Sequence, residues 1–145
     1  MPAKMNHYDA AIRVCVDQMA DGRVSGFLTS RRLTAPVPFS DLGSLVLQIE
    51  EILNRQCFPQ AFERTRSFTP AAPGRLPVAE DLNSGLSKEE VDAAQGQAAT
   101  FLLYVITRRN TTWQGFVDWL DGTRDDYSSA LELLRLIDQR LSARP

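Results

Sequence analysis

The sequence predicts an α+β fold in which two ββα units form one antiparallel sheet of four or more strands, with two helices on one face. Three observations lead to this prediction. Apolar residues alternate along two pairs of segments, as expected of half-buried strands. After each pair, apolar residues recur at spacings of three and four, as on one face of a helix. The second set follows the first at a nearly constant distance of 89 residues.

The first unit begins with an alternating segment at residues 11–16. Its buried side is predicted to hold Ile12, Val14 and Val16. Asp21-Gly22 is a typical hairpin turn, and residues 23–30 then form the second strand.

A helix follows these two strands after an extended connection. Pro36 and Pro38 restrict the connection to extended chain or a short edge strand. Ser40 is the expected N-cap of a helix that reaches about Arg55. The apolar stripe of this helix comprises Leu42, Leu45, Val46, Ile49, Ile52 and Leu53.

The second unit repeats this order from Thr100 onward. Asn110-Thr111 takes the place of the first turn, and Ser129 with Glu132 predicts a capping box at the start of the second helix. The strand residues that match the first unit are Phe101, Leu103, Val105, Trp113, Gly115, Phe116 and Val117. The helix residues that match are Leu133, Ile137 and Leu141.

The chain divides into three parts on this interpretation. Residues 8–68 hold the first unit and a possible extra strand at 61–68, where apolar and polar residues alternate. Residues 69–98 form a linker rich in proline and glycine, in which residues 87–90 could start one helical turn. Residues 99–145 hold the second unit, and we expect one pseudo-symmetric globular domain.

The two units are expected to share one core, because a lone hairpin with one helix buries too little apolar surface to be stable. Gly26 and Gly115 fall on the side that faces the helices, where we expect the missing side chain to let a helix approach the strand closely. The other residues predicted on this side are Ile12, Val14, Val16, Val24, Leu28, Phe101, Leu103, Val105, Trp113 and Val117.

The opposite side of the sheet is the predicted binding site. It carries Phe27, Leu102, Tyr104, Ile106 and Phe116. An apolar surface of this kind marks contact with another subunit, with a partner, or with a covering segment of the same chain. Three interpretations therefore stay open: an oligomer or protein interface, a linker that folds back over the face, and a platform for single-stranded nucleic acid.

Basic residues could form a rim around this face. They are Arg31, Arg32, Arg64, Arg66, Arg108 and Arg109. Arginines beside aromatic rings suit a single-stranded nucleic acid, because the rings stack on bases while guanidinium groups hold phosphates. A solvated rim with no ligand explains the same residues, and we prefer it because the chain is acidic overall and has no RNP-type motif.

The sequence offers little material for catalysis. His7 is the only histidine, so neither a histidine-based triad nor a site with several histidine ligands can be built. The known phosphate-binding and hydrolase motifs are absent. An acidic loop holds Asp118, Asp121, Asp125 and Asp126, which is also what a solvated loop before a helix would carry. We expect no catalytic residue, no metal and no cofactor, and an enzyme is the third alternative.

Charge and apolar patterning bear on the cell compartment and the partner class. The net charge of −2 and the pI near 5.4 disfavour a protein that neutralises many phosphates. The first nine residues lack the apolar stretch of a secretory signal, and no later run is long enough to cross a bilayer. We therefore expect a cytoplasmic protein without a membrane segment, in which Cys15 and Cys57 are thiols and not a disulfide.

Residues 112–120 (TWQGFVDWL) and 127–138 (YSSALELLRLID) resemble small bacterial proteins that have no assigned activity. Those proteins carry a tryptophan-glycine strand and then a helix start of the form aromatic-x-Ser-x-x-Glu-Leu-Leu. The resemblance covers about the last 45 residues. The first unit departs from it, with Val24 in place of the tryptophan and Gly43-Ser44 in place of Leu131-Glu132. The resemblance implies the same fold unit and a bacterial origin, and it implies no catalytic residue for this chain.

The function expected from these observations is binding. We expect a small non-catalytic binding or adaptor protein, of which an antitoxin-like or immunity-like protein would be an example, that uses the aromatic sheet face to form a homodimer or to dock a protein partner. The alternative is a module that binds single-stranded nucleic acid on Phe27, Tyr104 and Phe116.

Overall fold

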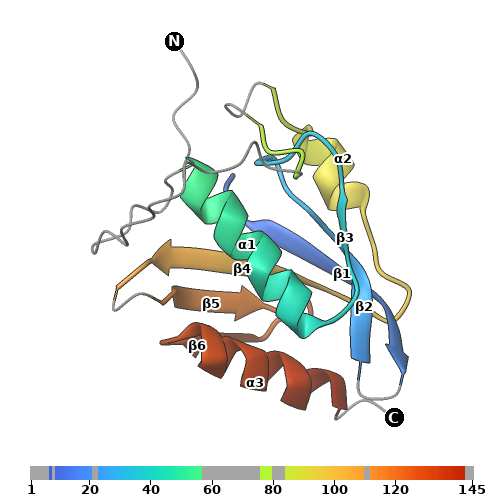
Figure 1. The fold of residues 1–145 in the computed structure, drawn as a ribbon. Coiled ribbons are helices and arrows are strands. Elements are labelled where there is room, and N and C mark those ends of the chain that lie inside the picture. Colours follow the sequence, from blue (N-terminus) through green and yellow to red (C-terminus); the bar gives the residue numbers. More distant parts are fainter. Residues whose placement is uncertain are drawn as a thin grey trace.

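The computed structural model describes residues 7, 9–20, 23–56, 76–79, 84–109 and 112–142. Within them, six strands and three helices confirm the predicted α+β class (Figure 1). The strands are β1 (Ile12–Ala20), β2 (Arg23–Thr29), β3 (Val37–Phe39), β4 (Ala99–Thr107), β5 (Gln114–Asp118) and β6 (Arg124–Tyr127). The helices are α1 (Leu42–Gln56), α2 (Lys88–Ala93) and α3 (Ala130–Ser142).

The strands form one antiparallel sheet in the order β3-β2-β1-β4-β5-β6. β1 and β4 are therefore the central strands, and β3 and β6 are the edges. The long helices α1 and α3 lie across the same face of this sheet (Figure 1), and their buried side chains join one hydrophobic cluster with those of the strands. Two helices on one face agree with the prediction.

Each half of the sheet contains one strand more than the predicted ββα unit. β3 lies where the two prolines leave room for an edge strand. β6 lies in the segment that the sequence predicts as an acidic loop. Of its four residues only Tyr127 is apolar, and only Tyr127 is buried, so the alternation that identifies a half-buried strand is missing.

The two hairpins have the same register. Val16 pairs with Gly26 on β2, and Val105 pairs with Gly115 on β5, each 89 positions later. Both hairpins then shift register, after Val16 in the first and after Val105 in the second. The central pairing of Arg13 with Leu102 lies on the pseudo-two-fold axis that relates the halves. The agreement concerns the hairpins, and the repetition of the whole ββα unit stays a prediction.

The glycines at these two bulges have a different role from the predicted one. A Cβ at Gly26 would lie 2.0 Å from the carbonyl oxygen of Cys15, and a Cβ at Gly115 would lie 1.9 Å from that of Tyr104. Both obstacles are backbone atoms of the neighbouring strand. The prediction that these glycines admit a helix is therefore wrong: they let two strands approach closely at a bulge.

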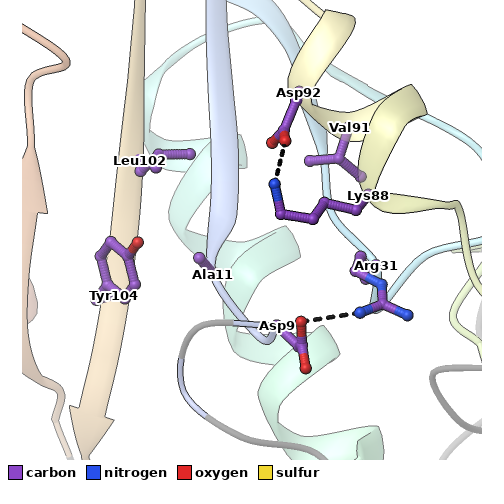
Figure 2. Close-up of a pocket in the computed structure, with 8 residues that line it drawn as sticks. All are labelled: Asp9, Ala11, Arg31, Lys88, Val91, Asp92, Leu102 and Tyr104. Carbon is purple, nitrogen blue, oxygen red and sulfur yellow. Dashed lines mark hydrogen bonds and ion pairs between the residues drawn. The ribbon is translucent and has the colours of Figure 1, made fainter.

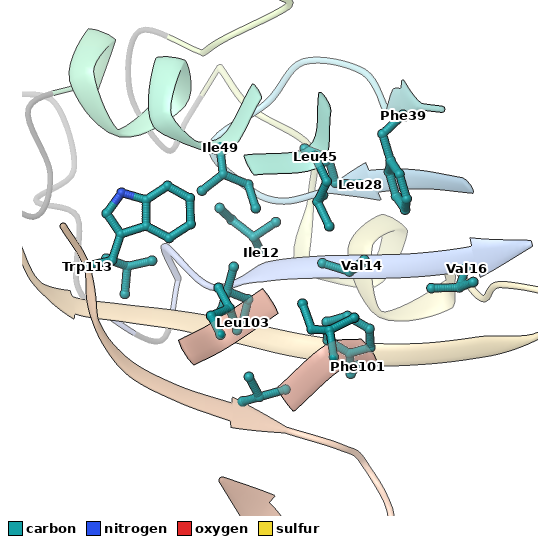
Figure 3. Packing of buried hydrophobic residues seen from close by; sticks show 14 of the residues in the cluster. Ile12, Val14, Val16, Leu28, Phe39, Leu45, Ile49, Phe101, Leu103 and Trp113 are labelled. Carbon is teal, nitrogen blue, oxygen red and sulfur yellow. The ribbon is translucent and has the colours of Figure 1, made fainter. Parts of the chain in front are cut away.

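The core lies between the sheet and the two long helices (Figure 3). All ten non-glycine residues predicted to face the helices are buried. Trp113 is fully buried and donates from Nε1 to Glu50 Oε2 of α1 at 2.6 Å. Tyr127 lies across Gly115, and its hydroxyl donates to the carbonyl oxygen of Tyr104 at 2.8 Å. The polar atoms of these two buried aromatic side chains thus have partners.

The starts of the helices follow local capping chemistry. Helix α1 is capped by Asp41, whose Oδ1 accepts from the backbone N–H of Ser44 at 2.7 Å, and not by the predicted Ser40. Ser129 caps α3, accepting from the N–H of Glu132 at 3.0 Å, but the predicted capping box is only half formed, because Glu132 Oε1 accepts from the N–H of Ser128 at 3.1 Å. Ser87 and Glu90 form a capping box on α2.

Some predictions fall outside the described residues. These are the extra strand at 61–68, and the turn residues Asp21-Gly22 and Asn110-Thr111. Across the parts of the chain that the structure describes, no helix is long and apolar enough to cross a membrane.

We predict opposite effects of alanine at two glycines. Gly115→Ala should lower the free energy of unfolding by about 2–3 kcal/mol, because the new Cβ would overlap the backbone of β4. Gly43→Ala, in the first turn of α1, should raise it by about 0.5–1 kcal/mol, because its Cβ meets only an ordinary contact, 3.4 Å from Asp41 Oδ1. Urea unfolding of both variants measures the two effects, and equal stabilities would contradict the close approach at the bulge.

Candidate functional site

The predicted site lies on the sheet side that points away from α1 and α3, which we call the open face. On β4, Leu102, Tyr104 and Ile106 alternate with residues buried against the helices and are themselves only half-buried. Phe116 on β5 pairs with Tyr104 and is also half-buried. Phe27 on β2 pairs with Cys15 of β1.

Part of the open face is covered by residues 84–98, which we call the strap. Arg13 Nε of β1 donates to the carbonyl oxygen of Ala94 at 2.6 Å. The backbone N–H of Ala98 donates to the carbonyl oxygen of Val16 at 2.8 Å. Beneath the strap Cys15 is fully buried and Arg13 nearly so. The interpretation in which the linker folds back is thus correct for the half of the face formed by β1.

The strap divides the five predicted binding residues into two groups. Leu102, Tyr104, Ile106 and Phe116 lie together on β4 and β5, and we call them the aromatic patch. Phe27 lies on the other side of β1, whose open-face side chains Arg13 and Cys15 are buried. The face is therefore not one contiguous surface.

The two rings of the aromatic patch stack on each other. The centroids of Tyr104 and Phe116 are 4.4 Å apart and the rings are inclined by 17°. The guanidinium carbon of Arg124, on β6, lies 4.2 Å from the centroid of Phe116, a cation–π contact. Arg124 also forms an ion pair with Asp126, in which Nη2 of the arginine lies 3.7 Å from Oδ1 of the aspartate.

Arg124 is a site residue that the sequence reasoning missed. The signal that could have found it is the repeat itself, since the edge strand allowed around Pro36 and Pro38 predicts an equivalent strand at residues 124–127. Asp126 then pairs with Phe116 as Pro38 pairs with Phe27.

A hollow of about 230 Å³ lies beside the patch, between α2 and β4 (Figure 2). It is lined by Asp9, Ala11, Arg31, Lys88, Val91, Asp92, Leu102 and Tyr104. Two ion pairs stand at its margin: Arg31 Nη1 lies 2.8 Å from Asp9 Oδ1, and Lys88 Nζ lies 2.7 Å from Asp92 Oδ2. The hydrogen bond to Asp92 raises the pKa of Lys88. Sites for drug-sized molecules are about 300–1,000 Å³, so this hollow suits a single side chain.

Four of the six predicted rim arginines fall within the described residues, and two of them are not on the rim. Arg32 is buried and donates from Nε to Gln56 Oε1 at 2.5 Å. Arg108 is buried and donates from Nη1 to Asn54 Oδ1 at 2.6 Å. Both hold the C-terminal end of α1 on the opposite side of the sheet. Burial, and secondly the charge of Arg108, lower the pKa of Arg32 to about 9.

The other rim predictions have different outcomes. Arg31 lines the hollow and is paired with Asp9. Arg109 is exposed at the end of β4. Arg64 and Arg66 lie outside the described residues.

Three carboxylates of the acidic loop make hydrogen bonds or ion pairs within the fold. Asp118 accepts from the N–H of Leu120 at 2.9 Å, in a turn where Leu120 has a φ of 62°. Asp121 accepts from the N–H of Thr123 and pairs with Arg140, and Asp125 accepts from Trp119 Nε1 at 2.8 Å. Searching the described residues finds no group of three or more histidine, cysteine or acidic side chains that could hold a metal ion.

We predict that Gly96→Val releases the strap and exposes Cys15. A Cβ at Gly96 would lie 2.4 Å from the backbone nitrogen and oxygen of Val16. In the intact protein Cys15 should react slowly with a thiol reagent at pH 8, because burial raises its pKa to about 11 and covers it. In a Cys57→Ser background, Gly96→Val should raise the labelling rate at least about tenfold, the reactivity of a thiol being controlled by its exposure and ionisation. Gln95→Val, at an exposed neighbouring position, is the control, and equal rates in the two variants would contradict the cover.

Comparison with known proteins adds no assignment to this site. No protein-family model, curated protein or solved structure matches the chain.

Proposed function

We propose that this protein is a non-catalytic binding protein whose aromatic patch receives a segment of a partner protein. The observation that carries the proposal is the difference between the two halves of the open face. The strap covers Arg13 and Cys15 of β1, whereas the stacked rings of Tyr104 and Phe116 stay partly exposed beside a hollow of side-chain size. Aromatic side chains next to a pocket are typical anchors of protein interfaces.

The edges of the sheet give less support to binding by strand addition. β3 is three residues long and contains Pro38, which has no N–H to donate. β6 carries Asp125 and Asp126, whose charges oppose pairing with a second acidic strand. Short, proline-containing or charged edges protect a sheet from pairing with other strands, which favours the face as the contact surface.

A protein partner has more support than a nucleic acid. Two of the predicted rim arginines, Arg32 and Arg108, are buried on the other side of the sheet and cannot contact phosphates. Tyr104 and Phe116 stack on each other, and Arg124 lies over Phe116, where a base would otherwise stack. Asp118 and Asp126 flank the rings and would repel a phosphate backbone.

We predict that Phe116→Asp abolishes partner binding. A carboxylate would break the ring stack, remove the apolar anchor and place a charge that must be desolvated in the interface, which costs several kcal/mol. The measurement is affinity capture from a lysate of the encoding organism, quantified by mass spectrometry against the unchanged chain. The control is Leu131→Asp on the outer surface of α3, where Leu131 is 60% exposed.

The same pair of variants separates the other outcomes. Light scattering after size exclusion would identify a second copy of the chain as the partner if a dimer forms and Phe116→Asp dissociates it. Equal capture by both variants would overturn the proposal. Salt-sensitive oligonucleotide binding that is lost only in Phe116→Asp would replace it with the nucleic-acid alternative.

A further inference from the structure

The covered and uncovered halves of the open face are equivalent in register but differ in chemistry. About the axis at Arg13 and Leu102, Cys15 corresponds to Tyr104. Thr29, which pairs with Arg13, corresponds to Asp118, which pairs with Leu102. At these two positions the half without a cover has an aromatic ring and a carboxylate where the covered half has a thiol and a hydroxyl.

The strap shows how a short segment covers one half of this face. Its helix, α2, has one turn and a half and buries a single side chain, Val91. The other side chains of α2 are exposed. The strap makes its polar contacts with the sheet through its own backbone; for example, the carbonyl oxygen of Ala94 accepts from Arg13 Nε. This cover belongs to the same chain, and it is held on the sheet by one fully buried apolar side chain, by partly buried neighbours such as Ala98, and by a few hydrogen bonds.

We propose that the partner presents a short helix with one large apolar side chain and at least one lysine or arginine, and that this helix lies beside α2 over β4 and β5. This inference rests on the function proposed above and specifies the partner's chemistry. The apolar side chain enters the hollow between Val91, Leu102 and Tyr104. The basic side chain pairs with Asp118.

The contact at the pseudo-two-fold axis is apolar in the uncovered half. Leu102 stands on β4 where the covered half has Arg13, so it has no group to donate to a helix carbonyl. A partner therefore cannot accept a hydrogen bond here as Ala94 of the strap does from Arg13, and it must contact Leu102 through apolar atoms. In the hollow beside it, the side chains of Leu102 and Val91 are available for that contact.

The charge of the partner follows from Asp118. Among the described residues, Arg124 pairs with Asp126 and Lys88 pairs with Asp92. Asp118 and Asp126 both lie beside Arg124, but only Asp126 is within ion-pair distance of it; Asp118 is the cross-strand neighbour of Arg124, makes no ion pair among the described residues, and accepts from the backbone N–H of Leu120. A cation of the partner would complete the charges along this side of the patch, and complementary charges of this kind set orientation and specificity.

The test is selection of a displayed library of random 12-residue peptides on the intact chain. We expect enriched peptides that carry one leucine or aromatic residue and a lysine or arginine three or four positions away, on one face of a helix. Synthetic copies of these peptides should bind at least about tenfold more weakly to Leu102→Asp, since an apolar contact is lost and a charge is desolvated. Tyr104→Ser is a second variant with the same expectation, and Leu131→Asp is the control that should bind as the unchanged chain does.

Asp118→Asn tests the charge separately from the apolar contact. It should weaken binding by about three- to tenfold and make the remaining affinity less dependent on salt. Acidic or uncharged peptides, or no effect of Asp118→Asn, would overturn the inference while leaving the patch as a protein-binding site. Peptides that bind Leu102→Asp and Tyr104→Ser as well as the unchanged chain, or no enrichment at all, would overturn the inference; the capture experiment with Phe116→Asp then decides on the proposed function by itself.

Discussion

The antiparallel pairing of β1 with β4 is the contact on which both halves of the molecule depend, because it joins two three-stranded sheets into one. A three-stranded sheet with a single helix would leave much of its apolar side in water. Once β1 and β4 pair, α1 and α3 lie over a continuous surface and share one hydrophobic cluster. The same pairing brings Leu102 and Tyr104 next to the segment that covers β1, and so creates the hollow.

The candidate site exists because the two hairpins share the same register while the strap covers only the half formed by β1. The register of the two hairpins agrees down to the bulges, so each open-face residue of one half has an equivalent in the other. Arg13 binds the backbone of the strap, whereas Leu102 presents only carbon atoms. This difference accounts for the polar contact of the strap with β1, and it supports the proposal that a partner contacts Leu102 through an apolar side chain.

Buried arginines connect the ends of the strands to the helical layer. Arg32 follows β2 and Arg108 follows β4, and both donate to side chains in the last turn of α1. In the second hairpin the bulge after Val105 moves the alternation by one residue, which turns Arg108 toward the helices. Residues that look like a basic rim therefore fix the position of α1 and leave less positive charge on the open face.

The sequence by itself determined the features that depend on neighbours along the chain. Alternation identified the helix-facing residues of both hairpins, and spacing identified the stripes of α1 and α3. Residues 87–90 indicated the start of one helical turn, and α2 begins there. These patterns are local, and a side chain's place in them follows from the period of the strand or helix.

Tertiary structure alone decided the features that depend on distant residues. β6 has no alternating pattern and becomes a strand because β5 offers a free edge. The strap covers β1 because Arg13 meets Ala94, which lies 81 positions away in the chain. The division of the aromatic face into a covered and an exposed part follows from that contact, and no local period of the sequence encodes it.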